Sequence, residues 1–147
     1  MFMLGLDSEE KLQEEKRKYK AGLSSYNKKF VHFFLLHPES NEVIGWCGYH
    51  IWYTDHDRAE IGYTFFNDEF KNKGFMTEVL AWVLNYGFKE MNLHRVEAFV
   101  GTDNVASLKL LDKFGFKKEG HAKEHSDTNN CFEDSLLFAL LAQDFQK

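Results

Sequence analysis

The chain of 147 residues has a formal net charge of -5, and hydrophobic residues make up 44% of it, with 15 phenylalanines and one proline. This length corresponds to one domain with a substantial aromatic core, and the composition argues against a disordered chain. The acidic balance excludes an overall attraction to nucleic acid or to an anionic membrane surface. Any anion site must therefore be local.

Two cysteines, Cys47 and Cys131, are too few for a disulfide framework and are typical of reduced thiols. No apolar run reaches the roughly 18 residues of a membrane span, and the N-terminal residues lack the pattern of a secretory signal. The sequence therefore predicts a cytoplasmic protein without membrane contact. The seven histidines lack ligand spacing, so we expect no metal site.

The first half of the chain is rich in predicted strands. The segment from Asp7 to Glu10 (DSEE) resembles a capping box and predicts a helix that runs to about Ala21. Short apolar and aromatic runs, separated by turn residues, then predict three strands. These strands are residues 30–36, 43–53 and 59–66.

The second half alternates strands and helices. Helical spacing of apolar residues predicts a helix over 74–91, and a strand over 95–100 follows. A shorter helix begins near Asp103 and stops at Gly115, where a left-handed cap is needed. The last predicted elements are two strands and a polar loop between them, at residues 116–120, 132–141 and 121–130. This order predicts a mixed α/β sheet with helices on its faces.

Lysines precede the long predicted helix in the stretch EFKNKGFMTEVL, from Glu69 to Leu80. Positive side chains are misplaced at the positive end of a helix dipole unless an anion binds there. Free amides at the helix start, with Gly74 admitting close approach, would form a nest for phosphate. A solvated turn with surface lysines is the alternative. The glycine patterns of nucleoside-triphosphate and dinucleotide loops are absent.

Five short motifs are individually weak but specific in combination. They are, in chain order, AEIGY (59–63), KNKGFM (71–76), LHRVEA (93–98), DNVAS (103–107) and KFGF (113–116). Together they resemble the GNAT superfamily of acyl-CoA-dependent N-acyltransferases. Within it, the chain is similar to the ribosomal-protein N-terminal acetyltransferases of the RimJ/RimL-like group. The resemblance runs from about Phe30 to the end of the chain.

The resemblance implies a GNAT fold, in which a central, mixed and mostly antiparallel sheet is splayed and flanked by helices. It implies one domain over residues 1–147, with the N-terminal strand of the family absent or shortened. Residues 1–6 could then pair at the open sheet edge, or a homodimer could cover it.

The resemblance also identifies the anion as the pyrophosphate of coenzyme A, with acetyl-CoA as co-substrate. The residues implied in the pyrophosphate nest are Asn72, Lys73, Gly74, Phe75, Met76 and Thr77, with Lys71 where arginine or glutamine is usual. The main chain of Phe66 would bond to the pantetheine arm, which would lie in the splayed sheet like an added strand. Asn104 matches the family asparagine that contacts this arm. It could instead, or also, cap the following helix.

Acyl transfer to an amine needs a base, a stabilised oxyanion and an acid for the leaving thiolate. We expect Glu60 to be the base, because the strand period places it beside Gly62 on one face. A strand glutamate paired with a lysine or arginine is the alternative. The usual acid tyrosine of the family is replaced here by Leu111. The RimJ/RimL-like group implies Ser107 as the acid, with a helix-surface hydroxyl as its alternative, and the Phe66 amide would hold the oxyanion.

The base also bounds the acceptor. An α-amino group with a pKa near 8 is about one-tenth neutral at pH 7, whereas a lysine near 10.4 is neutral far less often. A carboxylate base therefore favours a protein N-terminus, and the resemblance implies a ribosomal protein as a possible acceptor. We expect direct attack in a ternary complex, because no cysteine stands in a motif that suggests a covalent intermediate. A small amine (polyamine, aminoglycoside or amino acid) is the alternative acceptor. A non-catalytic acyl-CoA-binding module is the alternative from another class.

Overall fold

The computed structural model describes residues 3–4, 28–71 and 73–145. Its strands are β1 (Met3–Leu4), β2 (Lys28–Leu36), β3 (Val43–Tyr53), β4 (Arg58–Phe65), β5 (Arg95–Gly101), β6 (Lys117–Thr128) and β7 (Cys131–Leu141). Its helices are α2 (Phe75–Lys89) and α3 (Val105–Lys113), with short 3-10 turns η2 (Asp68–Phe70) and η3 (Ala142–Asp144). The helix expected over 7–21 lies outside the described residues.

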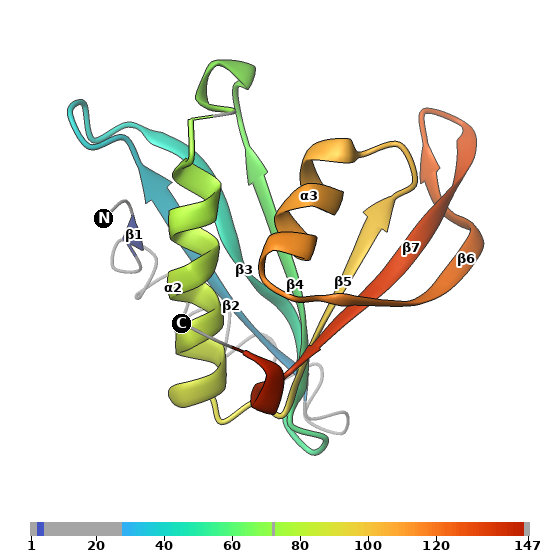
Figure 1. Cartoon of the computed structure of the whole chain (residues 1–147). Coiled ribbons are helices and arrows are strands. Elements are labelled where there is room, and N and C mark those ends of the chain that lie inside the picture. Colours follow the sequence, from blue (N-terminus) through green and yellow to red (C-terminus); the bar gives the residue numbers. More distant parts are fainter. Residues whose placement is uncertain (1–2, 5–27, 72, 146–147) are drawn as a thin grey trace.

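The strands form one sheet in the order β1-β2-β3-β4-β5-β7-β6 (Figure 1). Every neighbouring pair is antiparallel except β4 and β5, which are parallel. These two strands pair only between 58–60 and 95–97. Beyond this short contact they diverge, so that the sheet opens into a V (Figure 1). The expected mixed, mostly antiparallel and splayed sheet is confirmed.

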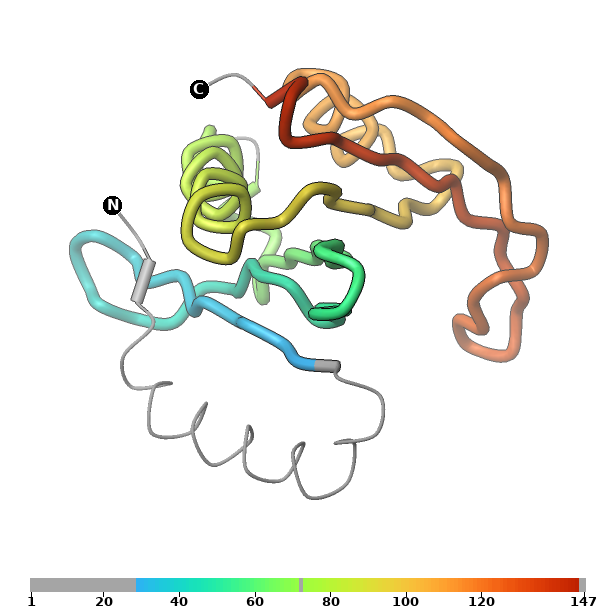
Figure 2. Tube along the Cα trace, turned by 90° about the horizontal axis from the view of Figure 1, so that it is seen from below, coloured from blue at the N-terminus to red at the C-terminus, as the bar shows by residue number. Residues whose placement is uncertain are grey.

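Both described helices pack on the same face of the sheet (Figure 2). Strand alternation directs the buried side chains of β2 toward α2, where the Phe33 ring meets Trp82 and Tyr86 edge-on, with centroids 5.0 and 5.1 Å apart. Tyr49 of β3 is fully buried, and its hydroxyl donates to the carbonyl of Val83 at 2.8 Å. These contacts fix α2, and therefore its N-terminus, against the sheet.

The β6–β7 hairpin is longer than the sequence predicted. Residues 121–128, expected as loop, belong to β6, and the two strands are joined by Asn129 and Asn130 with φ of 53° and 62°. Such a two-residue turn with both φ positive matches the twist of a hairpin. The prediction was wrong because β6 is exposed along most of its length and lacks an apolar alternation.

The N-terminal edge of the sheet is formed by β1. Met3 and Leu4 pair with Leu35 and Phe34 of β2. Pairing of the N-terminal residues is therefore confirmed for these two, and a homodimer stays a prediction. No helix within the described ranges is long and apolar enough to cross a membrane.

We expect Gly87→Ala to destabilise the protein, although alanine favours a helix by about 1 kcal/mol. A Cβ at Gly87 would overlap the Tyr49 hydroxyl, and such overpacking costs about 1–3 kcal/mol. Chemical denaturation measures the change. Gly120→Ala is the control, because its Cβ would find its nearest atom at 3.9 Å. Equal stability of the two variants would contradict the role of Gly87.

Candidate active site

A cavity of about 320 Å³ lies beside the end of β4 that has separated from β5, bordered by η2 and by the first turns of α2 and α3. Its walls include the expected residues Lys71, Gly74, Phe75, Met76, Thr77, Asn104 and Ser107. Two segments that are far apart in the sequence therefore meet at one cavity. Lys73, Phe66 and Glu60 are not among its wall residues, and Asn72 lies outside the described residues.

The start of α2 has the features of an anion nest. Gly74 is the N-cap, with a left-handed φ of 78° that glycine adopts without steric cost. No side chain in the described part of the chain caps this helix end, and a Cβ on Gly74 would meet no atom within 4 Å. The amides of a first helical turn lack intrahelical partners, and the helix dipole makes this end positive. Lys71 adds charge, although its ammonium lies 2.8 Å from the Asp68 carboxylate.

The main chain of β4 differs from the expectation at Phe66. The Phe66 amide donates to the carbonyl of Ile44 at 2.9 Å, so it is engaged by β3. The expected donation from Phe66 to a pantetheine arm or an oxyanion is therefore wrong. In an antiparallel ladder, alternate residues bond to the same neighbour. By this parity Tyr63 and Phe65 direct their main-chain groups to the other edge of β4, the edge that separates from β5.

Asn104 and Ser107 stand at the start of α3. The Asn104 side-chain oxygen accepts a hydrogen bond from the Ser107 amide at 3.2 Å, so its capping role is confirmed. Contact between Asn104 and a ligand stays a prediction. The Tyr63 hydroxyl oxygen is buried and forms no well-aligned hydrogen bond within the described ranges, although the Ser107 hydroxyl lies close enough to interact with it. Burial raises the pKa of Tyr63, and the neighbouring Ser107 lowers it by a smaller amount.

Sequence reasoning missed several wall residues of the cavity. They are Tyr63, Thr64, Phe65, Phe70, Ala106 and Leu110. Tyr63 was placed on the same strand face as Ala59 and Ile61, which are core residues. The available signal was the position of the Tyr63 phenol near the end of β4, shortly before the loop that leads to α2. It was indistinguishable from an aromatic core residue by pattern alone.

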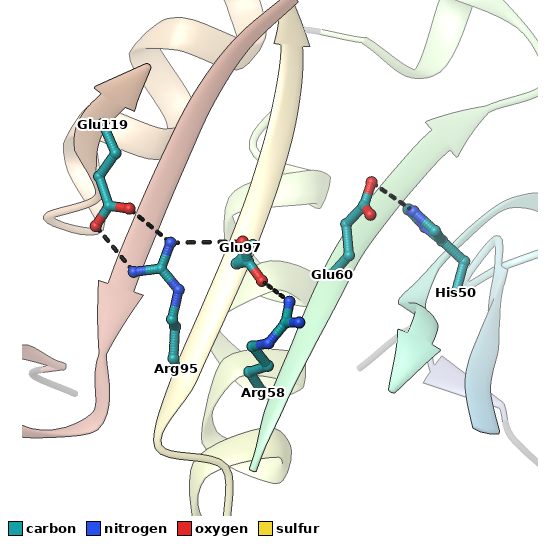
Figure 3. A network of polar contacts seen from close by, with 6 residues as sticks. All are labelled: His50, Arg58, Glu60, Arg95, Glu97 and Glu119. Carbon is teal, nitrogen blue, oxygen red and sulfur yellow. Dashed lines mark hydrogen bonds and ion pairs between the residues drawn. The ribbon is translucent and has the colours of Figure 1, made fainter. Parts of the chain in front are cut away.

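Glu60 lies at the vertex of the V, as the last residue of β4 that pairs with β5. Its carboxylate contacts His50 of β3, with 2.9 Å between Oε1 and Nε2 (Figure 3). The alternative of a structural pair with lysine or arginine does not describe this contact. The adjacent Glu97 of β5 is the residue that arginines hold, with Arg58 at 2.7 Å and Arg95 at 3.4 Å. Glu60 is therefore a partly exposed carboxylate with a titratable partner.

The cysteines lie away from this region. Cys47 is fully buried, and burial raises the pKa of its thiol. Cys131 is exposed on the β6–β7 hairpin, and neither thiol is in the cavity wall. Among the described residues, no three or more histidine, cysteine, aspartate or glutamate side chains are grouped as a metal site would require. The wall residues of the cavity offer main-chain amides, side-chain hydroxyls, the Asn104 amide and the Lys71 ammonium.

Comparison with known proteins assigns the family. A family model for an acetyltransferase (GNAT) domain matches residues 5–117. The N-acetyltransferase p20 of Bacillus licheniformis is 35% identical over 113 residues, which make up 77% of this chain and 63% of that protein. The chain thus spans less than two thirds of the length of this relative.

Solved structures share the fold. The ribosomal-protein-S5-alanine acetyltransferase of Vibrio fischeri is 27% identical with a TM-score of 0.76, and the match covers 94% of this chain and 72% of that one. A spermidine N-acetyltransferase of Vibrio cholerae is 23% identical with a TM-score of 0.72, covering 89% and 75%, and this likeness concerns the fold alone. Because the family model matches most of the sequence, the chain belongs to the GNAT family of acetyltransferases.

Proposed function

We propose that this protein transfers the acetyl group of acetyl-CoA to an amine, most favourably the α-amino group at the N-terminus of a protein. The observation that carries the proposal is the cavity at the splayed edge of β4. It joins the N-terminus of α2, which no side chain of the described residues caps, to hydroxyl and amide side chains from α3. The free thiols of both cysteines agree with the cytoplasmic location that is part of this proposal.

The residues around the cavity can bind two parts of coenzyme A, the pyrophosphate and the pantetheine arm. The turn at Gly74 would hold the pyrophosphate, because the backbone is open there and the helix end is positive. The main-chain groups of Tyr63 and Phe65 face the gap in the sheet, where an extended pantetheine arm would bond to them as an added strand does. Asn104, at the start of α3, would contact the same arm.

Acetyl-CoA supplies an activated thioester carbonyl to the site. Glu60 would take a proton from the acceptor amine, directly or through water, as the C–N bond forms and the C–S bond breaks. Main-chain amides at the free edge of β4 would stabilise the oxyanion. Ser107 would protonate the departing thiolate. The Tyr63 phenol, kept protonated by its raised pKa, lies beside Ser107 in the same wall. The thiols play no part in this direct attack.

The charges near Glu60 favour a monoamine such as a peptide α-amine. A polyamine carries further ammonium groups, which need unpaired carboxylates. Here the carboxylates of Glu97 and Glu119 both bind arginine. The similarity to an S5-alanine acetyltransferase supports the same acceptor class, and a ribosomal protein is the proposed partner.

The direct test uses acetyl-CoA with an alanine-led peptide, the same peptide blocked at its N-terminus, and spermidine. We expect thiol release with the free peptide only, and mass spectrometry should place the acetyl group on its α-nitrogen. Glu60→Gln should lower kcat about 100-fold or more, since general-base catalysis contributes at least that factor, and should leave acetyl-CoA affinity unchanged. Turnover with spermidine alone would indicate a small-amine enzyme. Binding of acetyl-CoA without any turnover would indicate a binding module.

Gly74→Ala should weaken coenzyme A binding at least about tenfold by calorimetry, because its methyl group would occupy the nest and disfavour the left-handed turn. Gly115→Ala is the matched control, since Gly115 has a similar φ of 85° and is not a wall residue. Both variants should lose similar thermal stability, but only the first should lose affinity. Equal affinities would place the pyrophosphate elsewhere.

Tyr63→Phe should leave the free energy of unfolding unchanged or slightly higher, because it removes a buried hydroxyl that forms no well-aligned hydrogen bond in the described part of the chain. The same change should lower kcat, by about tenfold if the phenol supports proton delivery. Tyr49→Phe provides the contrast, since its hydroxyl bonds to Val83 and its loss should cost about 1 kcal/mol without lowering kcat. A stability loss in Tyr63→Phe with unchanged kcat would make Tyr63 a core residue.

A further inference from the structure

His50 owes its position to an irregularity of the sheet. β3 and β4 are in register through the pair Tyr49 and Ile61, and the next pair is Ile51 with Glu60. One residue of β3, His50, is therefore the extra residue of a β-bulge. A bulge redirects a side chain out of the strict alternation of a strand. Here the bulge brings the His50 imidazole to Glu60, with 2.9 Å between Nε2 and Oε1.

The other cations near the vertex are engaged elsewhere (Figure 3). Arg58 binds Glu97, and Arg95 binds both Glu97 and Glu119, the last at 2.6 Å. Glu60 and Glu97 are opposite one another in the β4–β5 pairing. Because both arginines bond to other carboxylates, His50 is the ion-pair partner of Glu60 within the described part of the chain.

The surroundings of His50 fit the imidazole closely. A Cβ on Gly62 would lie 2.6 Å from His50 Nδ1 and 3.0 Å from the Trp46 ring, so only glycine leaves room for both side chains. Trp46 also meets His50 edge-on, with centroids 6.5 Å apart. His32 of β2 is the next titratable group, and its pKa is lowered by burial and by His50. The ring is thus held on three sides, with Nε2 directed at Glu60.

We propose that His50 is the positioning residue of Glu60, a role that rests on the proposed function of Glu60 as base. The imidazole carries its proton on Nε2 and donates it to Oε1 of the carboxylate. This bond fixes the carboxylate and leaves Oε2 to receive the proton of the acceptor amine, directly or through water. His50 itself neither gains nor loses a proton in the step. A carboxylate without this bond would rotate between several orientations, few of them productive.

The first test compares variants at position 50 by steady-state kinetics. His50→Ala should lower kcat by about 10- to 100-fold, the effect of a small misplacement of a catalytic group, with KM for acetyl-CoA unchanged. His50→Gln should keep kcat within about threefold of the wild type, because its amide nitrogen donates from nearly the same place. His56→Ala is the control for loss of an exposed imidazole and should change nothing.

A double-mutant cycle separates positioning from a merely structural effect. If His50 acts through Glu60, then His50→Ala should cause no further loss of kcat in the Glu60→Gln background. Gly62→Ala should reproduce part of the His50→Ala loss by displacing the ring, whereas Gly120→Ala, with an unobstructed Cβ, should not. An equal loss of kcat from His50→Ala in both backgrounds would overturn the proposal, as would no loss in the wild-type background.

A measurement without acetyl-CoA keeps the outcome independent of the proposed function. Long-range 1H–15N spectra of the free protein should show His50 with its proton on Nε2, and Glu60→Gln should shift that signal more than any other histidine signal. A proton on Nδ1 with none on Nε2, or no response to Glu60→Gln, would refute the positioning bond. Failure of the wild type to acetylate any amine would instead refute the proposed function, while the spectra still decide the state of His50.

Discussion

The short parallel contact between β4 and β5 is the constraint on which the site depends. If β4 and β5 paired along their whole length, the main-chain amides and carbonyls on their facing edges would all be hydrogen-bonded to each other. These strands pair only between 58–60 and 95–97, so the rest of the inner edge of β4 is left to face the cavity. The helix that begins at Gly74 and the helix that begins after Asn104 both point their first turns at this opening. Backbone geometry therefore creates most of the binding surface, and side chains refine it.

The carboxylates around the vertex of the V have two kinds of partner, arginine and histidine. Arginines neutralise Glu97 and Glu119, which are structural partners of β4, β5 and β6. Glu60 receives a histidine, which binds a carboxylate less firmly than an arginine does. Partly exposed ion pairs of this kind contribute little to stability, on the order of 1 kcal/mol or less. Under the proposed function, this arrangement leaves the Glu60 carboxylate free of arginine for proton transfer.

Two groups that a ligand could satisfy lie in the wall of the cavity. Gly74 has a positive φ at a helix end that no described side chain caps, and the Tyr63 hydroxyl is buried without a well-aligned hydrogen bond among the described residues. Two other buried polar atoms without a partner in the described ranges, His32 Nε2 and Asn85 Oδ1, lie outside the cavity wall. Unsatisfied groups in a cavity wall are expected at functional sites, because a ligand supplies the missing partners.

The sequence by itself determined most of the element types, the family, and about half of the wall residues of the cavity, and it predicted an anion site in the loop before Gly74. These are local properties, because helical periodicity, turn residues and short motifs depend only on residues close together in the sequence. Only the tertiary structure decided that Tyr63 and Phe65, not Phe66, face the opening, because ladder parity depends on which residue of β3 lies opposite. It also decided that His50 meets Glu60, because a bulge is a relation between two strands rather than a pattern in one of them.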